Sequence, residues 1–229
     1  MISDELTIRF TAGDFTRNGC LKPSSLQQAF QDVAQQHSAR EGFGYLDMLK
    51  ENLIWIITKL RYQVLFHPEP DTDYRLVTYP RPKKGMLYFR DFYLYDAEGN
   101  LYVRAISQWC VMDYSSRRLV RYPRDFQGEF TRESAIPEGF LRFTPGALTP
   151  AGEYHVTERD LDGNNHTNNC RYGDMVLHVL PDHIGNELSI TFSKETRLGD
   201  TIELFTSPSD AGLIVCGKKD GELIFSALT

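Results

Sequence analysis

Apolar and polar residues alternate along several stretches of the first half of the chain, a pattern typical of half-buried β-strands. The stretch at residues 54–66 places Ile54, Ile56, Leu60 and Tyr62 on one face. The stretches that predict strands are residues 5–10, 54–66, 74–79, 86–95 and 101–113. Residues 96–100, which include a glycine, predict a hairpin turn between the last two.

A helical spacing replaces this alternation after the first strand. The apolar face of the predicted helix consists of Leu26, Phe30, Val33, Ala34 and His37. Pro23 and the capping-box spacing of Ser25 and Gln28 predict where the helix begins. Gly42 predicts where it ends.

The second half of the chain repeats this order of elements. A strand at residues 154–158 precedes a helix at 168–180, which Pro181 ends. Four strands follow, at residues 187–195, 201–206, 213–217 and 223–227. Between the halves, residues 123–150 contain four prolines and have no sustained period, so they predict a surface linker. We therefore expect one unit at 1–122, a linker at 123–150 and a second unit at 151–229.

This doubled order of strand, helix and four strands predicts an α+β protein with a double hot-dog fold. In that arrangement each unit wraps a sheet around one central helix, and the two sheets pair edge to edge. The internal repeat already supplies a pair of units, so the sequence leaves open whether the chain also forms a homodimer.

Composition restricts the classes of protein that need to be considered. The chain has 229 residues, of which 41% are hydrophobic and 24% charged, as in a globular protein. No window reaches the roughly 18–20 apolar residues of a membrane span, and the first residues lack the pattern of a signal peptide. Four scattered cysteines without a C-x-x-C pair are typical of reduced thiols. We expect a cytoplasmic protein from a bacterium.

The net charge of −6 argues against a protein that binds nucleic acid non-specifically. Two basic clusters nevertheless interrupt the acidic sequence. One contains Arg81, Lys83 and Lys84, and the other contains Arg117, Arg118, Arg121 and Arg124. Such clusters are usually solvated surface, and an acidic partner is the alternative.

Polar residues capable of chemistry gather between Asp160 and Tyr172, just before the second predicted helix. An EF-hand calcium loop is one interpretation, but Asn165 and Arg171 stand where that loop needs glycine and a bidentate glutamate. A second interpretation is a set of turn and cap residues, with Thr167 or Asn168 capping the helix. This explains one or two of the polar residues and leaves the rest, so an active site is the third interpretation.

A resemblance to a known family supports the interpretation of this stretch as an active site. The stretch resembles the signature D-x-N-x-H-x-N-N-x-x-Y of the acyl-ACP thioesterase family, here filled by Asp162, Asn164, His166, Asn168, Asn169 and Tyr172. The family places a catalytic glutamate on the next strand, where this chain has Glu195, and plant members follow it with cysteine, where this chain has Thr196. Weaker similarity extends to residues 55–61, 88–96, 105–113 and 117–123.

The resemblance implies that Asp162, Asn164, His166 and Glu195 are the catalytic residues. If the loop is extended, Asp162, Asn164 and His166 project to the same side. We expect Glu195 and Asp162 to hold and deprotonate a water that attacks the thioester carbonyl, with direct attack by Asp162 as the other mechanism. Asn164 then supplies an amide donor, His166 orients the group or passes a proton, and N–H groups at the start of the helix serve the oxyanion.

The implied reaction is hydrolysis of fatty acyl-ACP to free fatty acid and ACP, which ends chain elongation. The partner is an acyl carrier protein with a phosphopantetheine-linked acyl chain, and the resemblance assigns the acyl pocket to the N-terminal unit. Metal, nucleotide and flavin motifs are absent from the sequence, so we expect no cofactor. Two alternatives remain, namely a hot-dog acyl-CoA thioesterase or dehydratase, and a non-catalytic acyl-binding module.

Overall fold

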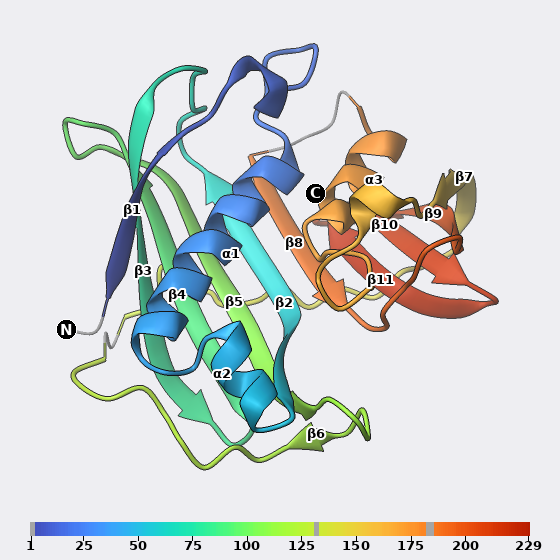
Figure 1. Cartoon of the computed structure of the whole chain (residues 1–229). Helices are drawn as coiled ribbons and strands as arrows, with labels where there is room; N and C mark the ends of the chain where they lie inside the picture. The colour runs from blue at the N-terminus through green and yellow to red at the C-terminus, as the bar shows by residue number, and fades with distance from the viewer. Residues whose placement is uncertain (1–2, 131–132, 182–185) are drawn as a thin grey trace.

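The computed structural model describes residues 3–130, 133–181 and 186–229. It contains one antiparallel sheet of eleven strands with three α-helices on it (Figure 1). The strands are β1 Asp4–Arg9, β2 Leu53–Val64, β3 Asp73–Lys84, β4 Leu87–Tyr95, β5 Leu101–Asp113, β6 Leu119–Val120, β7 Thr149–His155, β8 Glu187–Phe192, β9 Thr201–Ser209, β10 Gly212–Lys219 and β11 Glu222–Leu228. The helices are α1 Pro23–Arg40, α2 Tyr45–Lys50 and α3 Arg171–Val179.

The two halves of the sheet have the same topology. The N-terminal half runs β1-β3-β4-β5-β2 across the sheet, and the C-terminal half runs β7-β9-β10-β11-β8. In each half the chain first forms the strand at the outer edge, then crosses the sheet with a helix, and next forms the strand at the centre of the whole sheet. The two inner strands β2 and β8 pair antiparallel, from Lys59 opposite Thr191 to Gln63 opposite Glu187. The predicted edge-to-edge pairing of two sheets is confirmed.

The helix α1 lies across the concave face of the N-terminal half of the sheet (Figure 1). It buries Phe30 against Phe92 of β4, with ring centroids 4.8 Å apart. Pro23 occupies the first helical turn, as predicted, because its missing N–H is not needed there. The predicted capping box is wrong, because Lys22 is the N-cap and the Ser25 hydroxyl donates instead to Asp14 Oδ1 at 2.9 Å.

The helices α1 and α3 cross closely at Gly173. A Cβ atom at this position would lie 2.6 Å from Gln27 Nε2 and 2.7 Å from Pro23 Cβ, closer than real Cβ contacts. Glycine therefore permits the approach that brings the start of α1 against the second half of the chain. Gln27 is buried there at 2% exposure, and neither its amide nitrogen nor its amide oxygen has a hydrogen-bond partner in the described residues.

Several element boundaries differ from those that the sequence predicts. The helix α3 begins at Arg171 rather than near Asn168, and β8 ends at Phe192, before Glu195. The strand β7 ends at His155, whereas the sequence predicts this strand at residues 154–158. The six-residue helix α2 and the two-residue strand β6 were not predicted, because neither is long enough to show a period.

The segment between β6 and β7 carries no helix or strand where the structure describes it, that is, apart from residues 131–132. It is tied to the sheet by Asp91 of β4, whose Oδ2 accepts the Ala135 N–H at 3.0 Å and lies 3.8 Å from Arg81 Nε. The side chains of Ile136 and Ile106 pack together beside this contact. The boundaries at 122 and 150 remain a prediction. No helix in the described part of the chain is long and apolar enough to cross a membrane.

Asp91 predicts a pH dependence of stability. Its burial raises the pKa of the carboxyl to about 6, against an ordinary value near 3.8. The native state then holds the proton more tightly than the unfolded state, so stability falls as pH rises from about 4 to about 6. Asp91→Asn has no such titration. We therefore expect the free energy of unfolding of Asp91→Asn to rise relative to that of the wild type between about pH 4 and about pH 6, by up to about 3 kcal/mol.

Urea titrations of both proteins at pH 4 and pH 7.5 measure this difference. Asp73→Asn is the matched control, because Asp73 is exposed and the Arg9 guanidinium lowers its pKa. A gap between Asp91→Asn and wild type that is the same at both pH values contradicts the prediction.

Candidate active site

The Asp162 carboxylate organises a tight turn. Asp162 N–H donates to His166 O at 2.8 Å, and Leu161 and Thr167 form an antiparallel bridge around the turn. Asp162 Oδ1 accepts the N–H groups of Asn164 at 2.8 Å and His166 at 3.2 Å. The expectation of an extended loop is therefore wrong. A carboxylate that bonds the backbone two residues on favours a turn over a strand.

Asn164 still lies beside Asp162 within this turn. Asn164 Nδ2 donates to Asp162 Oδ2 at 3.4 Å, and Asn164 Oδ1 accepts the Tyr45 hydroxyl at 3.0 Å. The two contacts fix which end of the amide faces the carboxylate. Tyr45 begins α2, so a residue of the N-terminal half orients a residue of the motif. Nothing in the sequence marked Tyr45 as part of the site.

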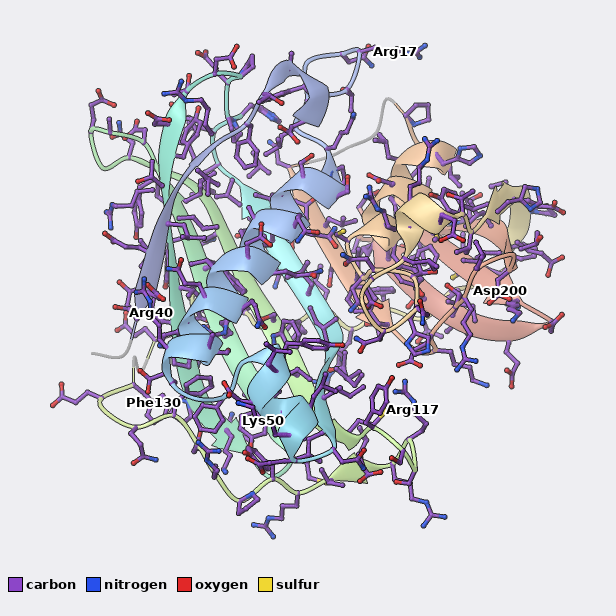
Figure 2. The ribbon with its side chains drawn as sticks, in the orientation of Figure 1. Arg17, Arg40, Lys50, Arg117, Phe130 and Asp200 are labelled. Carbon is purple, nitrogen blue, oxygen red and sulfur yellow. The ribbon has the colours of Figure 1, made fainter. Side chains whose placement is uncertain are left out.

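A second contact group contains His166 and Glu195. His166 Nε2 lies 3.4 Å from Glu195 Oε2, and the His166 side chain is 11% exposed. Arg117 Nη2 forms an ion pair with the other oxygen of Glu195. Arg117, labelled in Figure 2, reaches from the turn between β5 and β6 toward the C-terminal half. Glu195 is thus held on both oxygens, and its cationic partner comes from the N-terminal half.

Thr196 fastens the Glu195 segment to the motif. Thr196 is fully buried, and its carbonyl accepts the Thr167 N–H at 2.8 Å. Thr196 Oγ1 lies 2.7 Å from Thr167 Oγ1 and 3.1 Å from the Tyr172 hydroxyl. This network keeps Glu195 beside His166 although β8 has already ended. It also gives the hydroxyl at this position a structural role.

Asn168 joins the motif to α1. Its Oδ1 accepts Gln31 Nε2 at 3.2 Å and Cys170 N–H at 3.2 Å, and its Nδ2 donates to Gln28 Oε1 at 3.3 Å. Three of the N–H groups that were expected to serve the oxyanion are already occupied. The N–H groups of Asn168, Cys170 and Arg171 already donate to Asp160 O, Asn168 Oδ1 and Asn168 O.

A cavity of about 460 Å³ opens beside the motif. Asp162, Gly163, Asn164 and Asn169 form its wall on one side. The N-terminal half supplies most of the rest from α1, α2, β2, β4 and β5, including the apolar side chains of Met48, Ile54, Trp55, Tyr88 and Trp109. Phe126 adds to the apolar lining from the segment between β6 and β7. His166 and Glu195 are not part of this wall. The four predicted site residues therefore fall into two pairs, joined by the hydrogen bond from His166 N–H to Asp162 Oδ1.

The calcium interpretation does not fit this geometry. Asp160 would be the first ligand, but its carboxylate accepts the Tyr154 hydroxyl at 2.8 Å and the Thr157 N–H and hydroxyl at 2.8 Å each. It is 3% exposed. Among the residues that the structure describes, no three His, Cys, Asp or Glu side chains gather to hold a metal.

Cys170 is the one cysteine within the motif, and its surroundings argue against nucleophilic catalysis. Its thiol is 2% exposed and lies 3.6 Å from Gln28 Oε1. Burial raises the pKa of this thiol to about 12, so little thiolate forms at neutral pH. Cys170→Ala should keep turnover within about threefold of wild type, as steady-state hydrolysis would show. Loss of turnover in a folded Cys170→Ala protein contradicts a carboxylate mechanism.

Family models match almost the whole chain. Residues 2–130 match the N-terminal domain of acyl-ACP thioesterases, and residues 149–222 match the C-terminal domain. The chain belongs to the acyl-ACP thioesterase family. The resemblance drawn from the motif is confirmed, and the site residues lie in the region that the C-terminal model covers.

Curated relatives of this family include plant enzymes. The palmitoyl-acyl carrier protein thioesterase of Gossypium hirsutum is 27% identical over 212 residues, which is 82% of this chain and 50% of the relative. The dodecanoyl-[acyl-carrier-protein] hydrolase of Cinnamomum camphora is 25% identical over 215 residues, which is 80% of this chain and 55% of the relative. The chain spans about half the length of the curated relatives it matches.

Solved structures of the family have the same fold. An acyl-ACP thioesterase from Bacteroides thetaiotaomicron superposes with a TM-score of 0.85 at 18% identity, covering 98% of this chain and 96% of that one. The 12:0-ACP thioesterase from Umbellularia californica has a TM-score of 0.82 at 18% identity, with 99% and 96% covered. The predicted α+β double hot-dog fold is confirmed.

Proposed function

We propose that this chain hydrolyses the thioester of fatty acyl-ACP to free fatty acid and ACP, and so ends chain elongation. The observation that carries the proposal is the cavity, in which Asp162 and Asn164 share a wall with an apolar lining. A volume of about 460 Å³ is in the range of small-molecule sites. Membership of the family and the resemblance of the motif support the same reaction.

The apolar lining is suited to an acyl chain. Most of the lining comes from the N-terminal half. This supports a unit at 1–122 that forms the acyl pocket, a linker at 123–150 and a unit at 151–229 that carries the catalytic motif. Each buried methylene contributes about 0.8 kcal/mol, so neighbouring chain lengths differ only modestly in binding. We therefore expect a spread of products rather than one.

The mechanism that we propose is attack by a water molecule that carboxylates activate. Asp162 reaches the cavity directly, and Asn164 beside it is held by Tyr45 with its amide nitrogen toward Asp162. Glu195 holds and deprotonates this water together with Asp162, and His166, whose Nε2 lies 3.4 Å from Glu195 Oε2, passes a proton to the leaving thiolate. Direct attack by Asp162 on the thioester is the competing mechanism, and the position of Asp162 in the wall is compatible with both.

The test of the function is a product assay. The purified chain is incubated with a panel of acyl-ACPs and the matching acyl-CoAs, and free acid and free thiol are measured. We expect hydrolysis of acyl-ACPs with higher kcat/KM than of the corresponding acyl-CoAs. A preference for acyl-CoA supports the acyl-CoA thioesterase alternative, and tight acyl binding without any turnover supports a non-catalytic binding module.

The surface that we propose for the carrier protein is the turn and strand around β6. Arg118 and Arg121 are exposed there, and no carboxylate in the described part of the chain lies within 4.0 Å of either. Tyr114 and Leu119 are exposed beside them, at 42% and 48%. Arg117 links this turn to Glu195. In the other basic cluster, Arg81 and Lys83 face Asp91 and Asp125 at 3.8 Å and 3.7 Å, which leaves less charge free for a partner.

Carrier proteins of this class are acidic by resemblance, so binding at this surface should weaken as salt rises. We expect the association rate for acyl-ACP to fall most steeply with salt, because exposed charges steer the encounter. Arg118→Glu with Arg121→Glu should lower kcat/KM for acyl-ACP about tenfold at low salt and leave acyl-CoA hydrolysis nearly unchanged. Lys84→Glu is the matched control from the other cluster. A larger effect of Lys84→Glu, or an affinity that is flat in salt, contradicts the assignment.

We also infer a cytoplasmic location. The structure places all four cysteines as free thiols, three of them buried, which suits a reducing compartment. A homodimer stays a prediction, since the paired units lie within one chain.

A further inference from the structure

Hydrolysis of a thioester places a negative charge on its carbonyl oxygen. When the nucleophile adds to the carbonyl carbon, the π electrons move onto this oxygen, and they return when the C–S bond breaks and the thiolate leaves. Hydrogen-bond donors aimed at this oxyanion are usually the largest single contribution to such a reaction. The N–H groups of Asn168, Cys170 and Arg171 already have acceptors. The His166 N–H donates to Asp162 Oδ1. The oxyanion therefore needs other donors from the wall of the cavity.

Most amide side chains of the wall already donate to another residue. Gln28 Nε2 and Asn164 Nδ2 donate to carboxylates at 2.8 Å and 3.4 Å. Gln31 Nε2 donates to Asn168 Oδ1 at 3.2 Å. Each of these amides would have to share its nitrogen between its present partner and the oxyanion.

The aromatic donors of the wall are engaged as well. Trp55 Nε1 and the Tyr88 hydroxyl donate to backbone carbonyls at 2.9 Å and 3.1 Å. Trp109 Nε1 donates to Ser107 Oγ at 2.7 Å, and the Tyr45 hydroxyl donates to the motif itself. An indole nitrogen or a phenol has one hydrogen to give, so these groups are spent on the structure.

Asn169 is a motif residue whose amide has no such partner. It lies in the cavity wall with Asp162 and Asn164 and is half-buried. Neither its side-chain amide nor its backbone N–H forms a hydrogen bond with any residue that the structure describes. The preceding Asn168, in contrast, uses both ends of its amide in bonds to α1. The two neighbouring asparagines thus have different surroundings, since Asn168 fastens the motif and Asn169 faces the cavity.

We propose that the side-chain amide of Asn169 donates a hydrogen bond to the oxyanion, which makes Asn169 a further catalytic residue of this site. The assignment rests on the proposed function. It serves attack by water and attack by Asp162 equally, because both place the charge on the same carbonyl oxygen. The amide binds a charged oxygen more strongly than the neutral carbonyl oxygen of the bound substrate. Its loss should therefore lower kcat and leave KM almost unchanged.

The first measurement is steady-state hydrolysis of acyl-ACP by Asn169→Ala. We expect kcat to fall about 10²-fold, the usual effect of removing one oxyanion donor, and KM to stay within about threefold of wild type. Asn165→Gly is the matched control, because it removes an exposed amide of the same turn that lies outside the cavity wall. Glycine also tolerates the positive φ of 59° at this position. We expect this control to keep kcat within about threefold.

A second substrate distinguishes a donor from a residue that only supports the turn. In the dithioester of the same acyl-ACP, sulfur replaces the carbonyl oxygen, and sulfur is a weak hydrogen-bond acceptor. The ratio of kcat for the thioester to kcat for the dithioester therefore reports the hydrogen bond to the oxyanion. We expect this ratio to fall about tenfold in Asn169→Ala. A displaced Asp162 would instead slow both substrates equally.

In a folded Asn169→Ala protein, a kcat within threefold of wild type or an unchanged ratio overturns the proposal. If that variant does not fold, Asn169→Asp decides, because it keeps the shape of the side chain and replaces the NH2 donor by a charged oxygen. Turnover near the wild-type rate in Asn169→Asp overturns the proposal, and so does failure of both variants to fold, which gives the residue a structural role. Failure of the proposed function shows separately, since the wild type would then hydrolyse none of the acyl thioesters.

Discussion

Glu195→Gln and Asp162→Asn should each reduce turnover of acyl-ACP by about 10²-fold or more. Both changes keep the size of the side chain and one acceptor oxygen, but they replace the other oxygen by an NH2 donor and remove the capacity to accept a proton. Asp162→Asn also keeps an oxygen that can accept the N–H groups of Asn164 and His166, so the turn should survive. Acyl binding should survive as well, because it depends on methylenes buried against the N-terminal half.

The measurement is single-turnover hydrolysis with enzyme in excess over acyl-ACP, and circular dichroism is the check on folding. Since both groups are proposed to act on one water, the double variant should be little slower than either single variant. Hydrolysis in ¹⁸O-labelled water tests for the direct mechanism. Attack by Asp162 expels the thiolate and forms a mixed anhydride, and water that opens it at the Asp162 carboxyl carbon leaves the label in Asp162, whereas general-base attack puts the label straight into the fatty acid. Near wild-type rates in both folded variants would move the active site elsewhere.

Gly173→Leu should lower the free energy of unfolding by about 1–3 kcal/mol or more, the usual cost of forcing extra atoms into a packed contact. The new side chain would meet Pro23 Cβ and Gln27 Nε2, where even a Cβ atom is too close. Helix propensity alone predicts the opposite sign, because leucine is a better helix former than glycine by almost 1 kcal/mol. The sign of the change thus tests the crossing of α1 and α3 directly.

Urea unfolding followed by tryptophan fluorescence measures the effect. Gly13→Leu is the matched control, since Gly13 is exposed and a Cβ there would have its nearest contact at 3.8 Å. We expect the Gly173 variant to lose turnover too, because separating the helices pulls Gln28 and Gln31 away from Asn168. A Gly173→Leu protein as stable as wild type would contradict the packing described here.

Long periodic segments could be predicted well from the sequence. Residues 101–113 form β5 as predicted, and α1 begins at Pro23 as predicted, because alternation and helical spacing report burial on one face. The order of elements also led to the paired sheets. Short elements such as α2 could not be predicted, because six residues hold less than two turns of a helix.

The candidate site was predictable only through the resemblance of its motif. Asp162, Asn164 and His166 lie close in sequence, and the structure joins them through one turn rather than one extended face. Tyr45 and Arg117 escaped prediction as site residues because contacts across more than seventy positions leave no local pattern. Glu195 was found by its place in the family order, while Thr196 was noted only as the position where plant members have cysteine, and its role in holding Glu195 was not predicted.

The pairing of β2 with β8 has a consequence for how the chain is made. During synthesis the N-terminal half leaves the ribosome first, and its β2 then ends the sheet as an unpaired edge until β8 emerges. At about 5–20 residues per second this interval is on the order of ten seconds. An exposed inner strand is a template for pairing with another nascent chain. Slow translation of the segment between β6 and β8 should therefore promote aggregation, and supplying residues 149–229 in trans should suppress it.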